Sequence, residues 1–238
     1  MSFLYHTFFF DPIYNALILL FTILPWADAG VIVIILTVLV RLIIFPLSKK
    51  AVLTQVKMAE LGPDLVKIKE QYKDKAEEQA KLTLALYKER GVNPFSGILV
   101  IIVQIPIILA LYQIFVHFPE VNSALIYSFI SIPDHINTMF LGFLDIAAKS
   151  ATLAAFAAVS TYFQFQISAK GQVPPKGNSF GDNLTRSMQT QMKYFFPVIV
   201  FFISYKISGV IALYWLTTNL FSIGQEIFIR RNLKPISA

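Results

Sequence analysis

Residues 31–50 read VIVIILTVLVRLIIFPLSKK. From Val31 to Leu47 this stretch is almost wholly apolar and rich in β-branched residues, with Thr37 and Arg41 as interruptions. A helix that crosses a bilayer needs about 20 predominantly apolar residues. The stretch therefore predicts a membrane-spanning helix that carries an arginine well inside its apolar length.

The composition of the whole chain indicates an integral membrane protein. Of its 238 residues, 56% are hydrophobic and 14% are charged, whereas soluble domains contain about 25% charged residues. The chain has no cysteine, which excludes disulfides, thiolate metal sites and a cysteine nucleophile. Its three histidines lie far apart in sequence, so we expect no metal site.

Apolar stretches alternate with short polar segments, and this alternation predicts an all-α protein with five transmembrane helices. Small and polar residues in the third stretch favour close helix packing. The predicted segments are an external interfacial helix at 1–28, a first span at 29–48, a cytosolic helical hairpin at 49–93, a second span at 94–117, an external segment at 118–149, a third span at 150–168, a flexible cytosolic loop at 169–188, a fourth span at 189–207, a fifth span at 208–229 and a short basic tail at 230–238.

The distribution of basic residues predicts the orientation of these spans. Residues 49–93 contain ten Lys or Arg, 169–193 contain four and 229–238 contain three, which leaves only Lys149 and Lys206 for the other side. Short cytoplasmic loops carry the excess of Lys and Arg. We therefore expect an external amino terminus and a cytosolic carboxyl terminus, as five spans require.

The first 28 residues allow two interpretations. Ile13 to Trp26 is apolar, and Ala27-Asp28-Ala29 resembles the cleavage site of a signal peptide. However, no Lys or Arg precedes the apolar run, and Trp26 suits the level of the lipid headgroups. We favour an amphipathic helix in the outer interface over a cleaved signal peptide.

Between Ala51 and Arg90 acidic and basic residues are interleaved around an apolar stripe. This pattern predicts an antiparallel helical hairpin in the cytosol, with its turn at residues 72–78 and a kink or restart at Gly62-Pro63. Most of these charges simply solvate a surface. We expect the hairpin to recruit substrate or its delivery machinery, with five candidate residues: Lys57, Leu61, Pro63, Tyr72 and Tyr87.

Arg41 requires solvation, because an arginine at the centre of a spanning helix costs about 2.5–3.5 kcal/mol. No acidic residue lies within the spans except Glu226, near the cytosolic end of the last one. The simplest solution is a wet cavity lined by dipolar side chains, with Thr37, Gln104, Ser160, Gln164, Thr218 and Asn219 as candidates. The alternatives are that Arg41 snorkels to the headgroups and that Gln104 forms interhelical hydrogen bonds.

Over nearly its whole length the chain resembles the YidC family of membrane protein insertases. The resemblance is carried by LVRLIIFPL at 39–47, KMAELGP at 57–63, LYKERGVNPF at 86–95, QIPI at 104–107 with ALY at 110–112, and LYWLTTNLFS at 213–222. It implies five helices around a positively charged groove that is open to the cytosol and the lipid. By motif, Arg41 is the groove arginine, Trp215 matches a tryptophan of the last helix, and Gln164, with Gln166 as rival, matches a glutamine of the third.

The resemblance also implies a function: insertion of nascent membrane proteins without nucleotide hydrolysis. The sequence contains no GxxxxGK[ST] loop and no set of acid, base and nucleophile, so we expect neither an enzyme nor a cofactor. The chain resembles a minimal form of the family and is expected in a bacterial plasma membrane. Contacts with ribosomes, signal recognition machinery and the Sec translocase stay open, and no specific DNA binding is expected.

Two other functions fit the same residues. A small-anion transporter or channel would use Arg41 as its binding charge, and a structural assembly factor would hold other membrane subunits together. The sequence offers no paired broken helices of the kind found in transporters.

Overall fold

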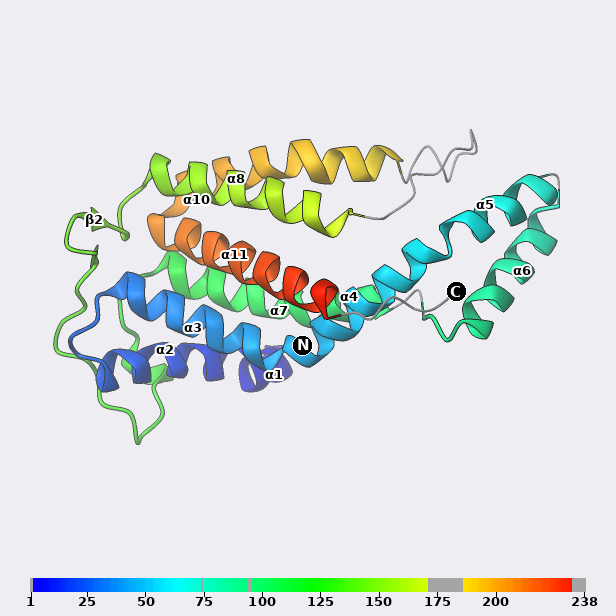
Figure 1. Ribbon diagram of the computed structural model, residues 1–238. Coiled ribbons are helices and arrows are strands. Elements are labelled where there is room, and N and C mark those ends of the chain that lie inside the picture. Colours follow the sequence, from blue (N-terminus) through cyan, green and yellow to red (C-terminus); the bar gives the residue numbers. More distant parts are fainter. Residues whose placement is uncertain (1, 74, 94–95, 171–185, 233–238) are drawn as a thin grey trace.

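A computed structural model describes residues 2–73, 75–93, 96–170 and 186–232. Figure 1 shows a helical bundle with connecting loops at one end and a helical hairpin that projects from the other. The strands β1 (Met139–Phe140) and β2 (Leu144–Asp145) are two residues long and pair with each other. The prediction of an all-α protein is confirmed in outline, whereas the number of membrane crossings stays a prediction.

The chain begins with α1 (Ser2–Tyr5), a π-helical turn at His6–Phe10 and α2 (Asp11–Ile23). Phe3–Ile23 is long and apolar enough to cross a membrane. Among the described residues, the bent pair Ala29–Ile43 and Phe45–Glu60 also meets this criterion when taken as one span. A shorter apolar helix, Ile102–Val116, also lies within the described part of α7.

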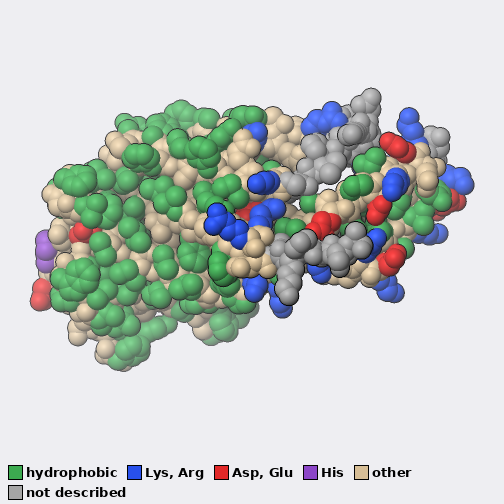
Figure 2. Space-filling view, viewed as in Figure 1, with side chains coloured by type: hydrophobic (Ala, Val, Ile, Leu, Met, Phe, Trp, Pro, Cys, Tyr) green, Lys and Arg blue, Asp and Glu red, His purple; other side chains and the backbone are tan. Residues whose placement is uncertain are grey.

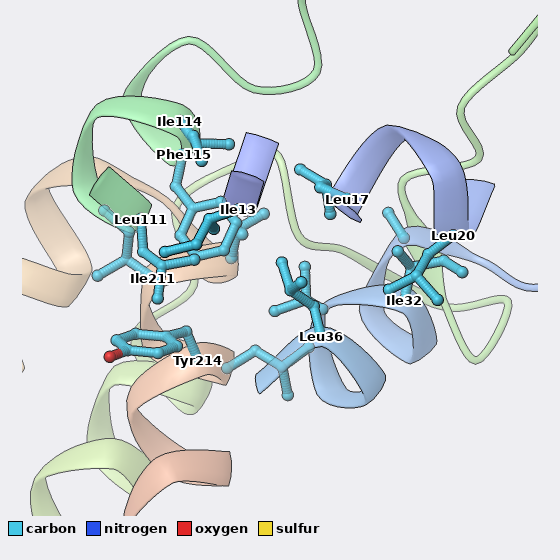
Figure 3. Packing of buried hydrophobic residues seen from close by; sticks show 14 of the residues in the cluster. Ile13, Leu17, Leu20, Ile32, Leu36, Leu111, Ile114, Phe115, Ile211 and Tyr214 are labelled. Carbon is cyan, nitrogen blue, oxygen red and sulfur yellow. The ribbon is translucent and has the colours of Figure 1, made fainter. Parts of the chain in front are cut away.

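The amino-terminal helix packs into the bundle. Ile13 and Leu17 of α2 belong to the same buried cluster as residues of α3 (Ala29–Ile43) and α7 (Ser96–Val116). In Figure 3, Ile13 lies in one group with Leu111 and Phe115, and Leu20 lies beside Ile32. A helix is present where one was predicted, but its apolar face contacts protein, which the sequence pattern did not reveal.

Polar side chains of α2 bind the long segment between α7 and α8 (Ala151–Ser168). Asn15 is 2% exposed; its amide nitrogen donates to the carbonyl of Leu125 over 2.9 Å, and its amide oxygen accepts from the Tyr127 backbone N–H over 2.7 Å. The Tyr14 hydroxyl accepts from the Asn122 backbone N–H over 2.7 Å. These contacts fix a segment that contains little regular structure.

The first predicted span, 29–48, is not one straight helix. Its helix α3 ends at Ile43, and α4 (Phe45–Glu60) continues at an angle of 63°. Pro46 lies in the first turn of α4, where its missing N–H is tolerated, and proline disfavours continuous helix through the residues before it. The helix therefore bends just after Arg41.

The predicted hairpin at 49–93 is present as α4, α5 (Gly62–Gln71) and α6 (Ala76–Glu89), and it projects from the bundle in Figure 1. The helix restarts at Gly62-Pro63, as predicted, with Pro63 in the first turn of α5. The first arm is thus α4 with α5, and the second arm is α6.

The last two helices form a tight hairpin. Residues 186–190 and a π-helical turn at Gln191–Phe195 lead into α10 (Phe196–Ile207), and α11 (Gly209–Arg231) follows after Ser208. A Cβ on Gly209 would lie 3.1 Å from the carbonyl oxygen of Ile146, so glycine permits this approach. Most of the predicted loop at 169–188, the end of the basic tail from 233 and the predicted helix start at Pro94 lie outside the described residues.

The surface separates into an apolar and a charged region. Figure 2 shows hydrophobic side chains over the bundle, while Lys, Arg, Asp and Glu gather at the hairpin end. Exposed apolar residues occur on several helices, including Ile105 of α7, Phe163 of α8, Phe202 of α10 and Leu220 of α11. Patches of this extent are unfavourable in water and indicate contact with lipid or protein.

Replacement of Asn15 by alanine tests how firmly the external segment is held. The change leaves the Leu125 carbonyl and the Tyr127 N–H without their side-chain partner, so we expect a loss of about 2–3 kcal/mol and a fall of about 5–10 °C in the thermal unfolding midpoint in detergent. The exposed Asn232→Ala variant, at the end of α11, is the control and should change stability by less than about 0.5 kcal/mol. Equal midpoints for both variants would contradict this role.

Candidate functional site

The bundle contains a cavity of about 560 Å³ between α3, α7, α8, α10 and α11. Most of its wall is apolar, but polar side chains from four of these helices also reach it. The polar lining consists of Arg41, Gln104, Tyr112, Thr161, Gln164, Tyr214, Trp215, Thr218, Asn219 and Ser222.

Arg41 enters the cavity from the last part of α3, two residues before that helix ends. Among the described residues, no Asp or Glu lines the cavity or forms an ion pair with its guanidinium. The side chain of Tyr214 lines the same cavity. Within the part of the chain that is described, the positive charge is therefore surrounded by dipoles and apolar groups rather than by a carboxylate.

Glu226 was the one acidic candidate for a partner, and it is engaged elsewhere. Its carboxylate is buried, and Oε1 accepts from Arg230 Nη2 over 2.8 Å and from Arg230 Nε over 3.0 Å. Its other oxygen, Oε2, accepts from the Ser168 hydroxyl over 2.6 Å. This acid therefore does not compensate Arg41.

Six of the eight residues predicted to line a polar groove surround this one cavity: Arg41, Gln104, Gln164, Trp215, Thr218 and Asn219. The other two do not line it. The hydroxyl of Thr37 is buried and donates to the carbonyl of Val33 over 2.6 Å, and the hydroxyl of Ser160 donates to the carbonyl of Ala157 over 2.8 Å. Gln166, the rival of Gln164, instead donates to the Tyr162 hydroxyl over 2.7 Å.

Asn219 joins α11 to α8. Its amide nitrogen donates to Thr161 Oγ1 over 2.7 Å and to Ser160 Oγ over 3.0 Å, and all three side chains are buried. Ser160 therefore does not line the cavity, but it helps to hold together the two helices that form its wall. Buried hydrogen bonds between helices are one use of such residues in membrane proteins.

Two polar atoms of the lining residues are not well satisfied by the protein. Among the described residues, Gln104 Oε1 and Thr218 Oγ1 are buried and form no short, well-aligned hydrogen bond, and the Tyr214 hydroxyl is their polar neighbour. An unsatisfied buried group of this kind costs about 1–3 kcal/mol. Water or a bound polar group would therefore be favourable next to them.

Thr161, Tyr214 and Ser222 also reach the cavity but were not selected from the sequence. Helix periodicity could have identified each of them, because side chains three or four residues apart lie on the same face of a helix. Thr161 precedes Gln164 by three residues, Tyr214 precedes Thr218 by four, and Ser222 follows it by four.

The five residues predicted for recruitment do not gather at the cavity. Leu61 is buried at the break between α4 and α5, whereas Lys57 and Pro63 are exposed on the first arm. Tyr72 is half-buried where α5 ends. Partial burial raises the pKa of the Tyr87 hydroxyl on α6 above its ordinary value, so this phenol is neutral at physiological pH. Their role in recruitment stays a prediction.

Comparison with known proteins gives the family. The family described as "60Kd inner membrane protein" matches residues 20–236. The membrane protein insertase YidC of Clostridium tetani is 27% identical over 207 residues, which cover 87% of this chain and 84% of that protein. The chain belongs to the YidC family. The resemblance stated from the sequence motifs is thereby confirmed.

Some YidC relatives are much longer. The YidC insertase of Francisella tularensis subsp. novicida is 31% identical over 205 residues, which cover 85% of this chain but only 32% of that protein. The match to the YidC family includes all five helices that surround the cavity. The described cavity therefore lies within the part that the chain shares with its family.

Replacement of Asn219 by alanine tests the link between α8 and α11. The change removes the three interhelical hydrogen bonds that the Asn219 amide donates, to Thr161, to Ser160 and to the carbonyl of Ala157. It leaves the surrounding hydroxyls in place, so we expect a loss of about 1–3 kcal/mol and a midpoint lower by about 3–10 °C. Ser222→Ala is the matched control on the same helix, because the Ser222 hydroxyl donates only to the carbonyl of Thr218 within α11. A destabilisation of equal size in both variants would argue against an interhelical role for Asn219.

Proposed function

We propose that the chain is a membrane protein insertase that receives polar segments of nascent membrane proteins in the Arg41 cavity. The observation that carries this proposal is a guanidinium inside a mostly apolar bundle with no carboxylate partner among the described residues. The names of its YidC relatives support it, since both proteins compared above are membrane protein insertases.

In the proposed topology, five helices cross the membrane: α3, α7, α8, α10 with the turn before it, and α11. The apolar surface of the bundle and the gathering of charges at the hairpin end support this arrangement. Because Lys and Arg concentrate in cytoplasmic segments, the hairpin end faces the cytosol of a bacterial plasma membrane. The shorter helices require a locally thinned bilayer or shielding by protein.

The proposed mechanism lowers the cost of moving a polar segment through the apolar layer. Dipoles and water in the cavity replace part of the hydration that the segment loses, and Arg41 attracts its acidic groups. Burial of the substrate's apolar helix in lipid supplies the driving force, at about 25 cal/mol per Å². The membrane potential adds about 2.3 kcal/mol per charge per 100 mV for an acidic segment, so no nucleotide is required.

In this proposal the hairpin recruits substrate from the cytosol. It carries ten of the twenty basic residues together with interleaved acids, so it offers binding sites for charged partners. Its basic residues and Arg230-Arg231 also attract ribosomal RNA and anionic lipid weakly.

A charge series at Arg41 tests the electrostatic role. The purified protein is reconstituted in liposomes, and the insertion of a single-span substrate is measured by protease protection of its amino-terminal tail. For an acidic tail we expect Arg41→Gln and Arg41→Ala to reduce the insertion rate about tenfold, equivalent to about 1.4 kcal/mol of lost attraction, whereas Arg41→Lys retains most of it.

Lys149→Gln is the control for this series, because it removes one positive charge from an exposed position outside the cavity. Its insertion rate should equal that of the parent. Equal rates in all Arg41 variants would reject the electrostatic role. Absence of insertion by the parent, with saturable anion flux in the same liposomes, would favour a transporter instead.

Removal of the outer hairpin tests recruitment separately. Residues 62–89, which comprise α5 and α6, are replaced by a short Gly/Ser linker, so α4 and its contacts with the bundle stay in place. We expect slower insertion with an unchanged thermal midpoint of the bundle, because the cavity and its walls are retained. Insertion at the parental rate would show that α5 and α6 have no role in recruitment.

A further inference from the structure

The cavity extends almost to the end of the bundle that lies opposite the hairpin. On α11 its lining begins at Ile211, two residues after the helix starts at Gly209. On α7 the lining includes Phe115, one residue before that helix ends. With about 3.6 residues per helical turn, less than one turn of α7 and of α11 separates the lining from this end. These two helices alone therefore form only a thin barrier between the cavity and the surface.

Residues 137–148, here called the strand segment because they contain β1 and β2, join two helices at this end of the bundle (Figure 1). At the start of α3, the Ala29 backbone N–H donates to the carbonyl of Asn137 over 2.8 Å. At the start of α11, the Val210 backbone N–H donates to the carbonyl of Ile146 over 2.9 Å. The strand segment therefore bridges two of the helices that line the cavity.

Asp28 holds the strand segment against α3. Its Oδ1 accepts from the Val31 backbone N–H over 3.0 Å and caps the helix, while its Oδ2 accepts from the Leu141 backbone N–H over 3.0 Å. Phe140 packs so closely on Gly30 that a Cβ at this position would overlap its ring. One carboxylate and one glycine thus fix the strand segment on the first turn of α3.

Ile146 is the most deeply buried residue of the strand segment. It is 0% exposed, and it belongs to the same buried cluster as Phe115 and Ile211 of the cavity lining. Its Cα and its carbonyl oxygen each lie 3.1 Å from the position of a Cβ on Gly209, so it contacts the start of α11 directly. Water and ions enter an apolar constriction only with difficulty. An apolar residue therefore lies at the end of the bundle where the helices provide little barrier.

We propose that Ile146 seals this end of the cavity against ions and that the strand segment holds the seal in place. Arg41 has no carboxylate partner among the described residues, so its positive charge attracts small anions into the cavity. An anion that continued through the bundle would discharge the membrane potential. Asp28 is a positioning residue of the seal. The proposal concerns the retention of ions, and it rests on the proposed function only for the placement of the bundle across a membrane.

The flux of a small anion in the absence of substrate tests the seal. The full-length protein is reconstituted in liposomes that contain a dye quenched by halides, and the entry of iodide is measured after rapid mixing. Ile146→Ser removes the branched apolar side chain and keeps the two backbone hydrogen bonds of this residue, to Thr138 and Val210. We expect iodide to enter about tenfold faster than with the parent, because a polar side chain lets water into the constriction.

Two variants control for the type of side chain and for the loss of stability. Ile146→Val keeps a branched apolar side chain and should retain the parental rate. Ile130 is also buried in the external segment and belongs to the same cluster, but the carbonyl of the next residue, Ser131, is bonded to Thr22 of α2. Ile130→Ser should therefore lower the thermal midpoint without a leak. Equal iodide entry with Ile146→Ser and Ile130→Ser would overturn the proposal.

Asp28→Asn tests the seal without a change in the buried cluster. One of the two carboxylate oxygens becomes an N–H donor, which cannot accept from Leu141 or Val31, so we expect iodide to enter about threefold faster than with the parent. Thermal unfolding identifies any variant that fails to fold. Parental entry with Asp28→Asn would contradict the positioning role of Asp28, and it would overturn the seal as well if Ile146→Ser does not fold.

The route of the leak is tested by the addition of Arg41→Gln to Ile146→Ser. We expect iodide entry to return toward the parental rate, because the charge that attracts the anion is removed from the cavity. Unchanged entry with the double variant would show that the leak bypasses the cavity and would overturn the proposal. No insertion substrate is present in these assays, so a failure of the seal is distinguishable from a failure of the proposed function.

Discussion

The position of one positive charge constrains the architecture of this protein. Arg41 lies in the cavity of an apolar bundle, where an arginine is costly unless other groups solvate it. An ion pair would reduce that cost but would also cancel the charge. Among the described residues, dipolar side chains rather than a carboxylate solvate Arg41. Gln104, Gln164 and Thr218 line the same cavity. Such groups stabilise the cation and leave its potential available to a ligand.

The helices that hold these dipoles require support of their own. Asn219 bonds α11 to α8, and Gly209 lets the backbone of the external segment approach the start of α11. Asn15 fixes the same external segment to α2. The Asn15 and Asn219 contacts are buried, satisfied polar interactions, which define helix position where lipid provides no hydrophobic driving force. Some polar residues of the bundle therefore line the cavity beside Arg41, and others hold the helices in position. The cavity depends on both groups.

Much of this arrangement could be predicted from local pattern, and the failures have a physical reason. The hairpin, its restart at Pro63 and the turn before Gly209 follow from residue chemistry over a few positions. Thr37 and Ser160 were assigned to the groove because they are polar and lie within spans. Their orientation depends on how the helices pack, and each instead bonds a carbonyl of its own helix. The burial of α2 likewise depends on partners about a hundred residues away.

The bend after Arg41 connects the cavity with the hairpin. Because Pro46 ends the straight course of α3, α4 leaves at 63° and packs on α7 and α11 instead of continuing along the bundle axis. Gln55 of α4 thereby reaches Ser168, which is bonded to Glu226. The base of the hairpin is therefore bonded to the end of α8, whose last residue is in turn bonded to α11. The position of α4 relative to the cavity walls is fixed by these contacts, since α8 and α11 both line the cavity.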